Sequence, residues 1–88
     1  MRTDKFLKVS RLIKRREVAK ELCENGNVSI NGRAAKASSE INAGDTVVLR
    51  LGRHTLTVAI HEVRPFANKE QANSLYEIIS DEVSEKGE

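Results

Sequence analysis

The sequence has a single cysteine, Cys23, and therefore cannot form a disulfide within the chain. It has no Cys-x-x-Cys pair, and no cysteine is spaced with a histidine in the way that zinc sites require. Stabilisation by an internal disulfide bond or by a structural zinc site is therefore excluded. Cys23 falls on the apolar side of a predicted helix, so we interpret it as a small buried side chain rather than a nucleophile.

Long hydrophobic runs are also missing. No apolar stretch approaches the roughly 20 residues needed to cross a bilayer, and the N-terminal MRTDKFLK lacks the apolar core of a signal peptide. We therefore predict a cytoplasmic protein that contacts no membrane. The chain has 88 residues, 39% of them hydrophobic, which fits one small domain, predicted over residues 1–80.

Aromatic residues are scarce, at 3% of the chain, and we interpret all three as core or cover: Phe6, Phe66 and Tyr76. Single-strand binders stack successive bases on aromatic side chains, so this class is disfavoured. The chain also lacks a set of nucleophile, base and metal ligands that could form a catalytic centre. His54 and His61 fall in a predicted hairpin and are expected to be exposed there. We predict no enzyme activity, no cofactor, no metal site and no small-molecule substrate.

Positive charge is abundant, but only at one end of the chain. Residues 1–20 hold eight basic side chains and two acids, whereas the rest of the chain holds seven basic and eleven acidic side chains. This asymmetry places positive potential on the surface that the first elements form, as expected for a polyanion partner. The alternative is that the basic run is an ordinary solvated helix face.

A short first helix is predicted over residues 4–9. Thr3 is expected to cap it, because a threonine hydroxyl can accept a hydrogen bond from a free backbone amide of the first turn. Phe6 and Leu7 would face inward. Asp4 favours the helix start through the dipole, and its carboxylate could equally orient a nearby arginine.

A second, stronger helix is predicted over residues 14–25, with Gly26 as its left-handed stop. Its apolar stripe consists of four residues, Val18, Ala19, Leu22 and Cys23. Three cations would crowd its first turn, where the helix dipole disfavours them: Lys14, Arg15 and Arg16. We interpret a sequence that accepts this cost as using the charges to bind an anion.

Alternating apolar and polar residues predict strands after the second helix. Asn31-Gly32 is a strong hairpin signal, because both central positions of a type I′ turn need a positive φ. A second hairpin is predicted from residues 46–51 and 55–60, with a core face made by Val47, Leu49, Leu51, Leu56, Val58 and Ile60. The predicted fold class is α+β, with two N-terminal helices packed on a small, twisted, mainly antiparallel sheet.

The C-terminal part has weaker signals. Pro65 ends the regular pattern, and residues 69–79 form a short amphipathic stretch. For the last part of this stretch, residues 74–79, the sequence does not decide between helix and strand. The stretch has four apolar residues that are predicted to cover the core: Leu75, Tyr76, Ile78 and Ile79. Residues 81–88 carry four acids and one lysine and are predicted to fray.

The order of motifs in the first half resembles the S4-type RNA-binding domain. The family pattern runs R-x-D-K-F-L, R-L, a basic residue, R-x-x-A, G-x-V-x-V-N-G, K and G-D, and this chain has MRTDKFLKVSRLIKRREVAKEL followed by GNVSINGRAAKASSEINAGD. The resemblance covers residues 1–51. It implies an α-L motif, two helices on a small sheet, that grips structured RNA. The chain departs from the pattern at Thr3, Arg15 and Ala37, and without the usual proline at position 37 the loop after Lys36 is expected to be less fixed.

The resemblance also implies which residues contact RNA. The basic positions of the pattern fall on Arg2, Lys5, Arg11, Arg16 and Lys36, and its turn falls on Asn31-Gly32. The side chains add an argument of their own, because a guanidinium binds phosphate through parallel N–H groups and lysine acts as a point charge. The complete predicted RNA-binding set is Arg2, Lys5, Lys8, Arg11, Lys14, Arg15, Arg16, Lys20, Asn31, Gly32 and Lys36. The turn could equally serve the hairpin alone.

Among S4-type proteins, the sequence most resembles stand-alone members that work in bacterial ribosome-associated quality control. This resemblance implies binding to 23S rRNA of the large ribosomal subunit and to peptidyl-tRNA, with RqcH as a protein partner during alanine tailing of stalled chains. The alternative is a heat-shock S4 protein that rescues large subunits carrying nascent chains. Such proteins have a long basic extension, whereas this sequence ends short and acidic.

Two other classes stay open. Two helices joined by a short turn suggest a DNA-binding module, although few Asn or Gln side chains are available to read base edges, and strands replace a third helix. A protein-only adaptor would use the acidic residues 77–88 as its contact. Loss of Arg16 distinguishes these classes, because it disables an RNA module and leaves such an adaptor intact.

Overall fold

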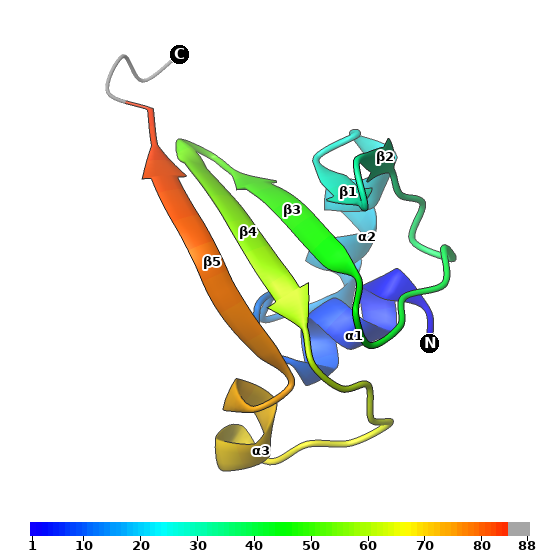
Figure 1. The fold of residues 1–88 in the computed structure, drawn as a ribbon. Helices are drawn as coiled ribbons and strands as arrows, with labels where there is room; N and C mark the ends of the chain where they lie inside the picture. The colour runs from blue at the N-terminus through cyan, green and yellow to red at the C-terminus, as the bar shows by residue number, and fades with distance from the viewer. Residues whose placement is uncertain (85–88) are drawn as a thin grey trace.

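The computed structural model describes residues 1–84. They form α1 (Thr3–Val9), α2 (Arg16–Glu24), β1 (Val28–Ile30), β2 (Arg33–Ala34), β3 (Thr46–Leu51), β4 (His54–Ile60), α3 (Lys69–Asn73) and β5 (Tyr76–Val83). The strands make one antiparallel sheet in the order β2-β1-β3-β4-β5. α1 and α2 pack together against one face of this sheet (Figure 1). The predicted α+β fold class is confirmed.

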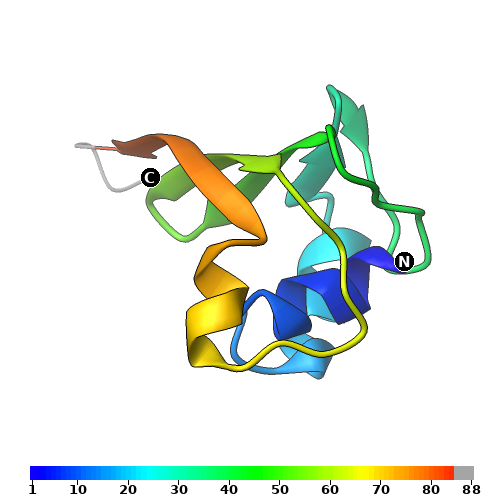
Figure 2. The same cartoon turned by 60° about the horizontal axis from the view of Figure 1, so that its bottom comes forward.

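The helical layer covers only part of the sheet. Figure 2 shows α1 and α2 beneath the sheet, with the tip of the β3-β4 hairpin and the C-terminal end of β5 extending past them. Figure 1 shows the same extension from another side. The sheet therefore has one region packed on helices and one region without a helical layer.

The start of α1 differs from the prediction. Thr3 is the first helical residue, Arg2 occupies the N-cap position, and no side chain caps the helix. The Thr3 hydroxyl instead donates to the carbonyl of Ser39 at 2.8 Å. Backbone amides of the first turn donate to the same loop, Thr3 to Ser39 at 2.9 Å and Asp4 to Ala37 at 3.2 Å. Loop carbonyls thus satisfy the helix end that a hydroxyl was predicted to satisfy.

The end of α2 agrees with the prediction. Gly26 adopts φ 75°, a left-handed conformation that glycine reaches without a Cβ penalty. Its amide donates to the carbonyl of Cys23 at 3.1 Å, and the amide of Asn27 donates to the carbonyl of Leu22 at 2.8 Å. These two bonds define a Schellman motif, which satisfies the last carbonyls of the helix.

The apolar stripe of α2 is narrower than predicted. Ala19 and Cys23 are buried, whereas Val18 is 44% exposed. Consecutive residues lie about 100° apart around a helix, so Val18 falls outside the face that packs on α1 and β1. The prediction that Val18 belongs to the apolar stripe of this helix is wrong. Burial raises the pKa of the Cys23 thiol, and the carboxylates of Asp4 and Glu24 act in the same direction.

Both predicted hairpins are present. Asn31 and Gly32 have φ angles of 52° and 84°, as a type I′ turn requires. β3 and β4 pair antiparallel, with Val47 opposite Val58 and Leu49 opposite Leu56 on the predicted core face. These strands and the helices share one core, whose most deeply buried apolar residues are Phe6, Leu7, Ala19, Val28, Ile41, Val47, Leu49, Val58 and Leu75.

The open assignment of residues 74–79 is resolved as a turn followed by a strand, because α3 ends before this segment and β5 begins within it. Leu75 is buried, and Tyr76 packs against the core. Ile78 and Ile79 are more than half exposed, so the prediction that they cover the core is wrong. Their place in the fold explains this, since β5 is at the edge of the sheet and runs past the helices.

Two more predictions fail in this part of the chain. β5 continues to Val83, so the predicted fraying of residues 81–88 is wrong for residues 81–83, and residues 85–88 lie outside the described residues. Phe66, predicted to be core or cover, is 83% exposed in the loop between β4 and α3. An apolar side chain is suited to burial, but burial also requires an element that lies over it.

Candidate functional site

Asp4 lies at the centre of the predicted basic surface. Its side chain is only 4% exposed and accepts hydrogen bonds from Arg2 through Nε at 3.1 Å and Nη2 at 3.3 Å. Arg16 contacts the same carboxylate, with Nη2 3.3 Å from Oδ1 and Nε 3.2 Å from Oδ2. The backbone amide of Lys5 donates to Oδ1 at 2.8 Å. The structure shows both roles predicted for Asp4, because its carboxylate lies in the first turn of α1 and also orients two arginine side chains.

Local structure brings these groups together. Arg2 is the N-cap residue of α1 and Asp4 is in its first turn, so both lie at the same end of the helix. Arg16 is the first residue of α2, which packs against α1. Lys14 and Arg15 precede α2, so the predicted crowding of three cations in its first turn is wrong for these two. The buried carboxylate beside Arg16 offsets the unfavourable dipole at that position.

The carboxylate of Asp4 is charged at neutral pH. Burial acts to raise its pKa, but hydrogen bonds from Arg16, Arg2 and the Lys5 amide outweigh burial, and the pKa lies below the ordinary value for aspartate. We call Arg2, Asp4 and Arg16 the arginine cluster. Its two positive charges exceed its single negative charge by one, which is the charge that one phosphate diester would balance.

The arginine cluster has hydrogen-bond donors that do not contact Asp4. Each guanidinium has five N–H groups, and the contacts with Asp4 engage one on Nε and one on Nη2. Three N–H groups of each arginine remain for another acceptor, and both side chains are about half exposed. Because the carboxylate already fixes both guanidinium groups, little side-chain freedom is lost when an anion binds.

Two neighbouring hollows extend the arginine cluster into a larger basic surface. One is lined by the cluster together with Glu17 and Lys20. The other also includes Arg2 and Lys20, and its remaining lining residues are Lys36, Cys23, Glu24, Ala37 and Ser38. Cations outnumber acids in both. The fold therefore places Lys36, distant in sequence, beside the cations of the two helices.

The loop that carries Lys36 is held by hydrogen bonds. The Lys36 amide donates to Oγ of Ser39 at 2.8 Å, and the Ser39 amide donates to the Lys36 carbonyl at 3.0 Å. The Ser39 carbonyl accepts from Thr3, and Ala37 is buried. These contacts hold a loop that has no proline at position 37.

A second group of cations surrounds a separate hollow at the end of α1 and the linker that follows it. Lys8, Arg11 and Lys14 line it together with Leu12 and Ile13. Arg11 has φ 64°, a left-handed conformation that costs a residue with a Cβ about 1–2 kcal/mol. An arginine at a position that glycine would occupy more cheaply indicates a role for its side chain. We call Lys8, Arg11 and Lys14 the linker cations.

Comparison with known protein families agrees with this geometry. The family model described as S4 domain matches residues 1–47, which include the arginine cluster, Lys20, Lys36 and the linker cations. The chain belongs to the S4 domain family. The motifs quoted from the sequence and the α-L arrangement of α1, α2 and the sheet are therefore those of S4 domains.

Known S4 domain proteins are similar over the whole chain. The RQC P-site tRNA stabilizing factor of Halalkalibacterium halodurans is 50% identical over 88 residues, which are all of both chains. The RQC P-site tRNA stabilizing factor of Bacillus subtilis is 50% identical over 82 residues, 93% of this chain and 95% of its own. The trimeric structure of Vibrio cholerae heat shock protein 15 matches 99% of this chain and 84% of its own, with a TM-score of 0.82 and 30% identity.

Four predicted RNA-binding residues of the S4 domain line none of the three hollows described above: Lys5, Arg15, Asn31 and Gly32. The side chain of Asn31 is engaged within the protein. Its Nδ2 donates to Oδ1 of Asp45 at 3.0 Å, and its Oδ1 accepts from the Thr46 amide at 2.9 Å. These bonds join the turn to the start of β3 and support the structural role of the turn.

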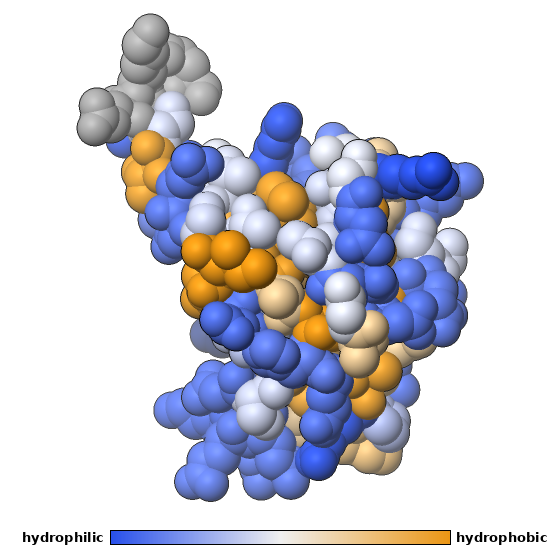
Figure 3. Space-filling model, in the orientation of Figure 1, coloured by the Kyte–Doolittle hydropathy of each residue, from blue (hydrophilic) through white to orange (hydrophobic). Residues whose placement is uncertain are grey.

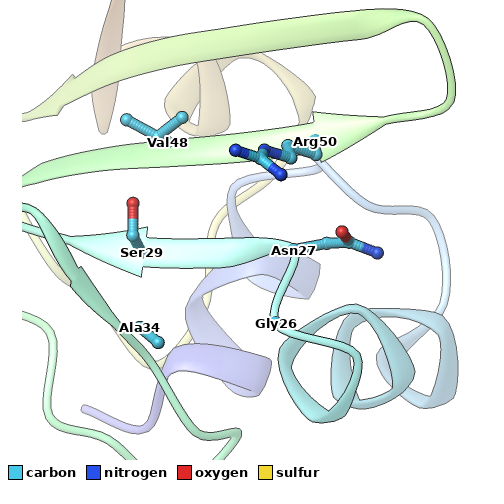
Figure 4. Close-up of a pocket in the computed structure, with 6 residues that line it drawn as sticks. All are labelled: Gly26, Asn27, Ser29, Ala34, Val48 and Arg50. Atoms are coloured by element: carbon cyan, nitrogen blue, oxygen red, sulfur yellow. The ribbon is translucent and has the colours of Figure 1, made fainter.

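One hollow has no counterpart in the sequence analysis. It lies on the sheet face turned away from α1 and α2, and Figure 4 shows its lining residues: Gly26, Asn27, Ser29, Ala34, Val48 and Arg50. Arg50 is the charged residue among them. A single arginine at an outward position of a strand forms no pattern in the sequence, so nothing in the sequence could indicate this hollow.

No helix within residues 1–84 is long and apolar enough to span a bilayer. In the same part of the chain, no group of three or more His, Cys, Asp or Glu side chains is placed to hold a metal ion.

Proposed function

We propose that this S4 domain protein is a non-catalytic RNA-binding factor of the large ribosomal subunit. It binds 23S rRNA and peptidyl-tRNA there, and it assists RqcH while alanine tails are added to stalled nascent chains in the cytoplasm. The observation that carries the proposal is the arginine cluster, in which a buried carboxylate holds two guanidinium groups with free donors beside one hollow.

Phosphate is the ligand that suits the arginine cluster best. Guanidinium groups bind phosphate oxygens through parallel N–H groups, and these two guanidinium groups are already oriented by Asp4. Structured RNA is recognised mainly through phosphates, 2′-hydroxyl groups and shape. Lys20 and Lys36 add point charges at the neighbouring hollow. The cluster and these lysines form the main RNA-binding surface.

The two separate groups of cations support contacts with two RNA segments. The arginine cluster lies at the N-terminal end of α1. The linker cations lie at its C-terminal end, with Lys8 in the last turn and Arg11 and Lys14 after it. A factor that holds a tRNA against rRNA needs two such contacts. We assign the arginine cluster to rRNA and the linker cations to tRNA.

The names of the relatives support a role of this chain in ribosome-associated quality control. RQC P-site tRNA stabilizing factor refers to RQC and to P-site tRNA, and the 50% identity extends along the whole chain. Heat shock protein 15 supports a second candidate function, the rescue of large subunits that carry nascent chains. Its identity of 30% is lower, which favours the first candidate.

Binding measurements with purified components test the proposal. The chain is titrated against isolated large subunits, tRNA and a DNA duplex over a range of salt concentrations. We expect the tightest binding to large subunits, with a log-log salt slope of about −4, because about five phosphates are neutralised. A flat salt response, or tighter binding to the DNA duplex, would contradict the proposed RNA surface.

A further inference from the structure

β5 is the longest strand of the described sheet and lies at its edge. Its 8 residues, Tyr76–Val83, pair with β4 along one side. Within residues 1–84, no segment pairs with the other side. Alternate backbone N–H and C=O groups along that side are therefore available to another chain.

β5 lacks two of the features that most often protect an edge strand against pairing, namely short length and lysine or proline. Edge strands are commonly shortened or carry lysine or proline, and β5 is long and contains neither residue. A register shift opposite Thr57 and Val58 interrupts the strand once, but residues 80–83 pair regularly beyond it. Residues 80–83 therefore form a regular segment to which another strand can be added.

Three apolar side chains of β5 are more than half exposed: Ile78, Ile79 and Val83. Figure 3 shows apolar surface along β5, at the middle of the strand and near its C-terminal end. The helical layer does not reach this region of the sheet (Figure 2). Exposed aliphatic side chains beside a free strand edge are typical of a surface that another protein covers.

Charge selects the kind of partner. β5 contains Glu77, Asp81 and Glu82, and neither β4 nor β5 contains a lysine or an arginine. Glu77 and Asp81 contact His61 and His54, at 3.2 Å and 3.0 Å, and both histidines are exposed as predicted. The arginine cluster and the linker cations lie on the helical layer instead. This edge of the sheet is therefore acidic.

We propose that the outer edge of β5 binds an extended, lysine- or arginine-rich segment of a partner protein, which adds to the sheet as a further strand. Backbone hydrogen bonds supply affinity, and the basic side chains of the segment pair with the acids of β5. A second copy of this chain fits less well, because pairing two β5 strands places acids beside acids. RNA fits less well because its phosphates meet the same carboxylates.

A synthetic peptide tests the edge directly. The probe is about as long as β5 and alternates lysine with valine, and two counterparts have glutamate in place of lysine or methyl groups on alternate backbone amides. We expect the lysine peptide to shift the NMR signals of residues 76–83 and to slow their amide exchange by about tenfold. Equal binding by the methylated peptide, or shifts centred elsewhere, would overturn the proposal.

Matched variants separate the edge from general charge effects. Glu82→Lys and Ile79→Ser are expected to weaken peptide binding by about fivefold or more, whereas Glu70→Lys makes the same charge change on α3 and is expected to have little effect. Thermal melts confirm that each variant is folded. If Glu70→Lys weakens binding as much as Glu82→Lys, or if sedimentation shows that the chain self-associates through β5, the proposed occupant is wrong.

Discussion

Nε of Arg16, on α2, lies 3.2 Å from Oδ2 of Asp4, on α1, so one carboxylate joins the two helices that carry the basic surface. The same carboxylate holds Arg2 at 3.1 Å. The exposed pair of His54 and Asp81 is different, because water solvates both of its partners. Asp4 is buried and depends on its arginines for compensation. Under the proposed function, stability and RNA binding are therefore linked at Asp4.

Asp4→Asn tests this link through stability. We expect the free energy of unfolding to fall by about 1–3 kcal/mol, because hydrogen bonds to a charged acceptor are lost while the shape of the side chain is kept. Urea denaturation at neutral pH measures the change. The control is Asp81→Asn, which alters an exposed pair and is expected to change stability by less than about 1 kcal/mol. Equal effects of the two variants would show that the Asp4 contacts add no particular stability.

The lowered pKa of Asp4 predicts a pH dependence of stability. Unfolding returns this carboxyl to its ordinary pKa of 3.8, so the unfolded chain binds the proton at a higher pH than the folded chain does. The stabilisation is complete above that value and is lost as the pH falls through the folded pKa. Free energies of unfolding measured from about pH 6 to about pH 2 should fall more steeply for the wild type than for Asp4→Asn. Parallel curves would contradict the lowered pKa.

Local signals in the sequence predicted much of the fold. The turn at Asn31-Gly32, the stop at Gly26 and the core face of the β3-β4 hairpin follow from backbone preferences and from period-two alternation. Which apolar residues are covered could not be predicted in this way. Val18 and Ile79 have the same apolar character as core residues, but no neighbouring element lies over them. Burial depends on tertiary packing, which short segments do not specify.

For the candidate site, too, local sequence predicted some features, whereas others depend on tertiary packing. The basic residue types and their order indicated an RNA surface, and Asp4 was recognised as a carboxylate that could orient an arginine. The pairing of Asp4 with Arg16 depends on how α1 and α2 pack, and the position of Lys36 depends on the loop that is tied to Thr3. The division of the cations into two groups also required the structure.

Arg2→Ala and Arg16→Ala are each expected to weaken binding to large subunits by about 1–3 kcal/mol, because each removes phosphate donors. The two arginines share one carboxylate, so we expect the losses in the double variant to be non-additive by about 0.5 kcal/mol or more. Co-sedimentation with isolated subunits measures the affinities, and thermal melts check folding. Arg53→Ala, in the β3-β4 turn, is the control. Additive losses would contradict a shared role, and wild-type binding by both single variants would rule out the site.

Arg11→Gly is expected to separate stability from binding. Glycine adopts the left-handed conformation of position 11 without a Cβ penalty, so the free energy of unfolding should stay the same or rise by up to about 1 kcal/mol. RNA binding should weaken by about 1 kcal/mol or more, because a linker cation is lost. Urea denaturation and tRNA titration measure the two effects. Unchanged tRNA and subunit binding would show that Arg11 has no RNA contact.

The central claim is that the arginine cluster holds ribosomal RNA, and sedimentation of cell lysate through a sucrose gradient tests it most directly. Wild type, Arg16→Ala and Arg53→Ala are followed across the free, large-subunit and whole-ribosome fractions. We predict wild type and Arg53→Ala in the large-subunit fraction and Arg16→Ala at the top of the gradient. If Arg16→Ala sediments with large subunits as wild type does, or if wild type stays at the top, the account is contradicted.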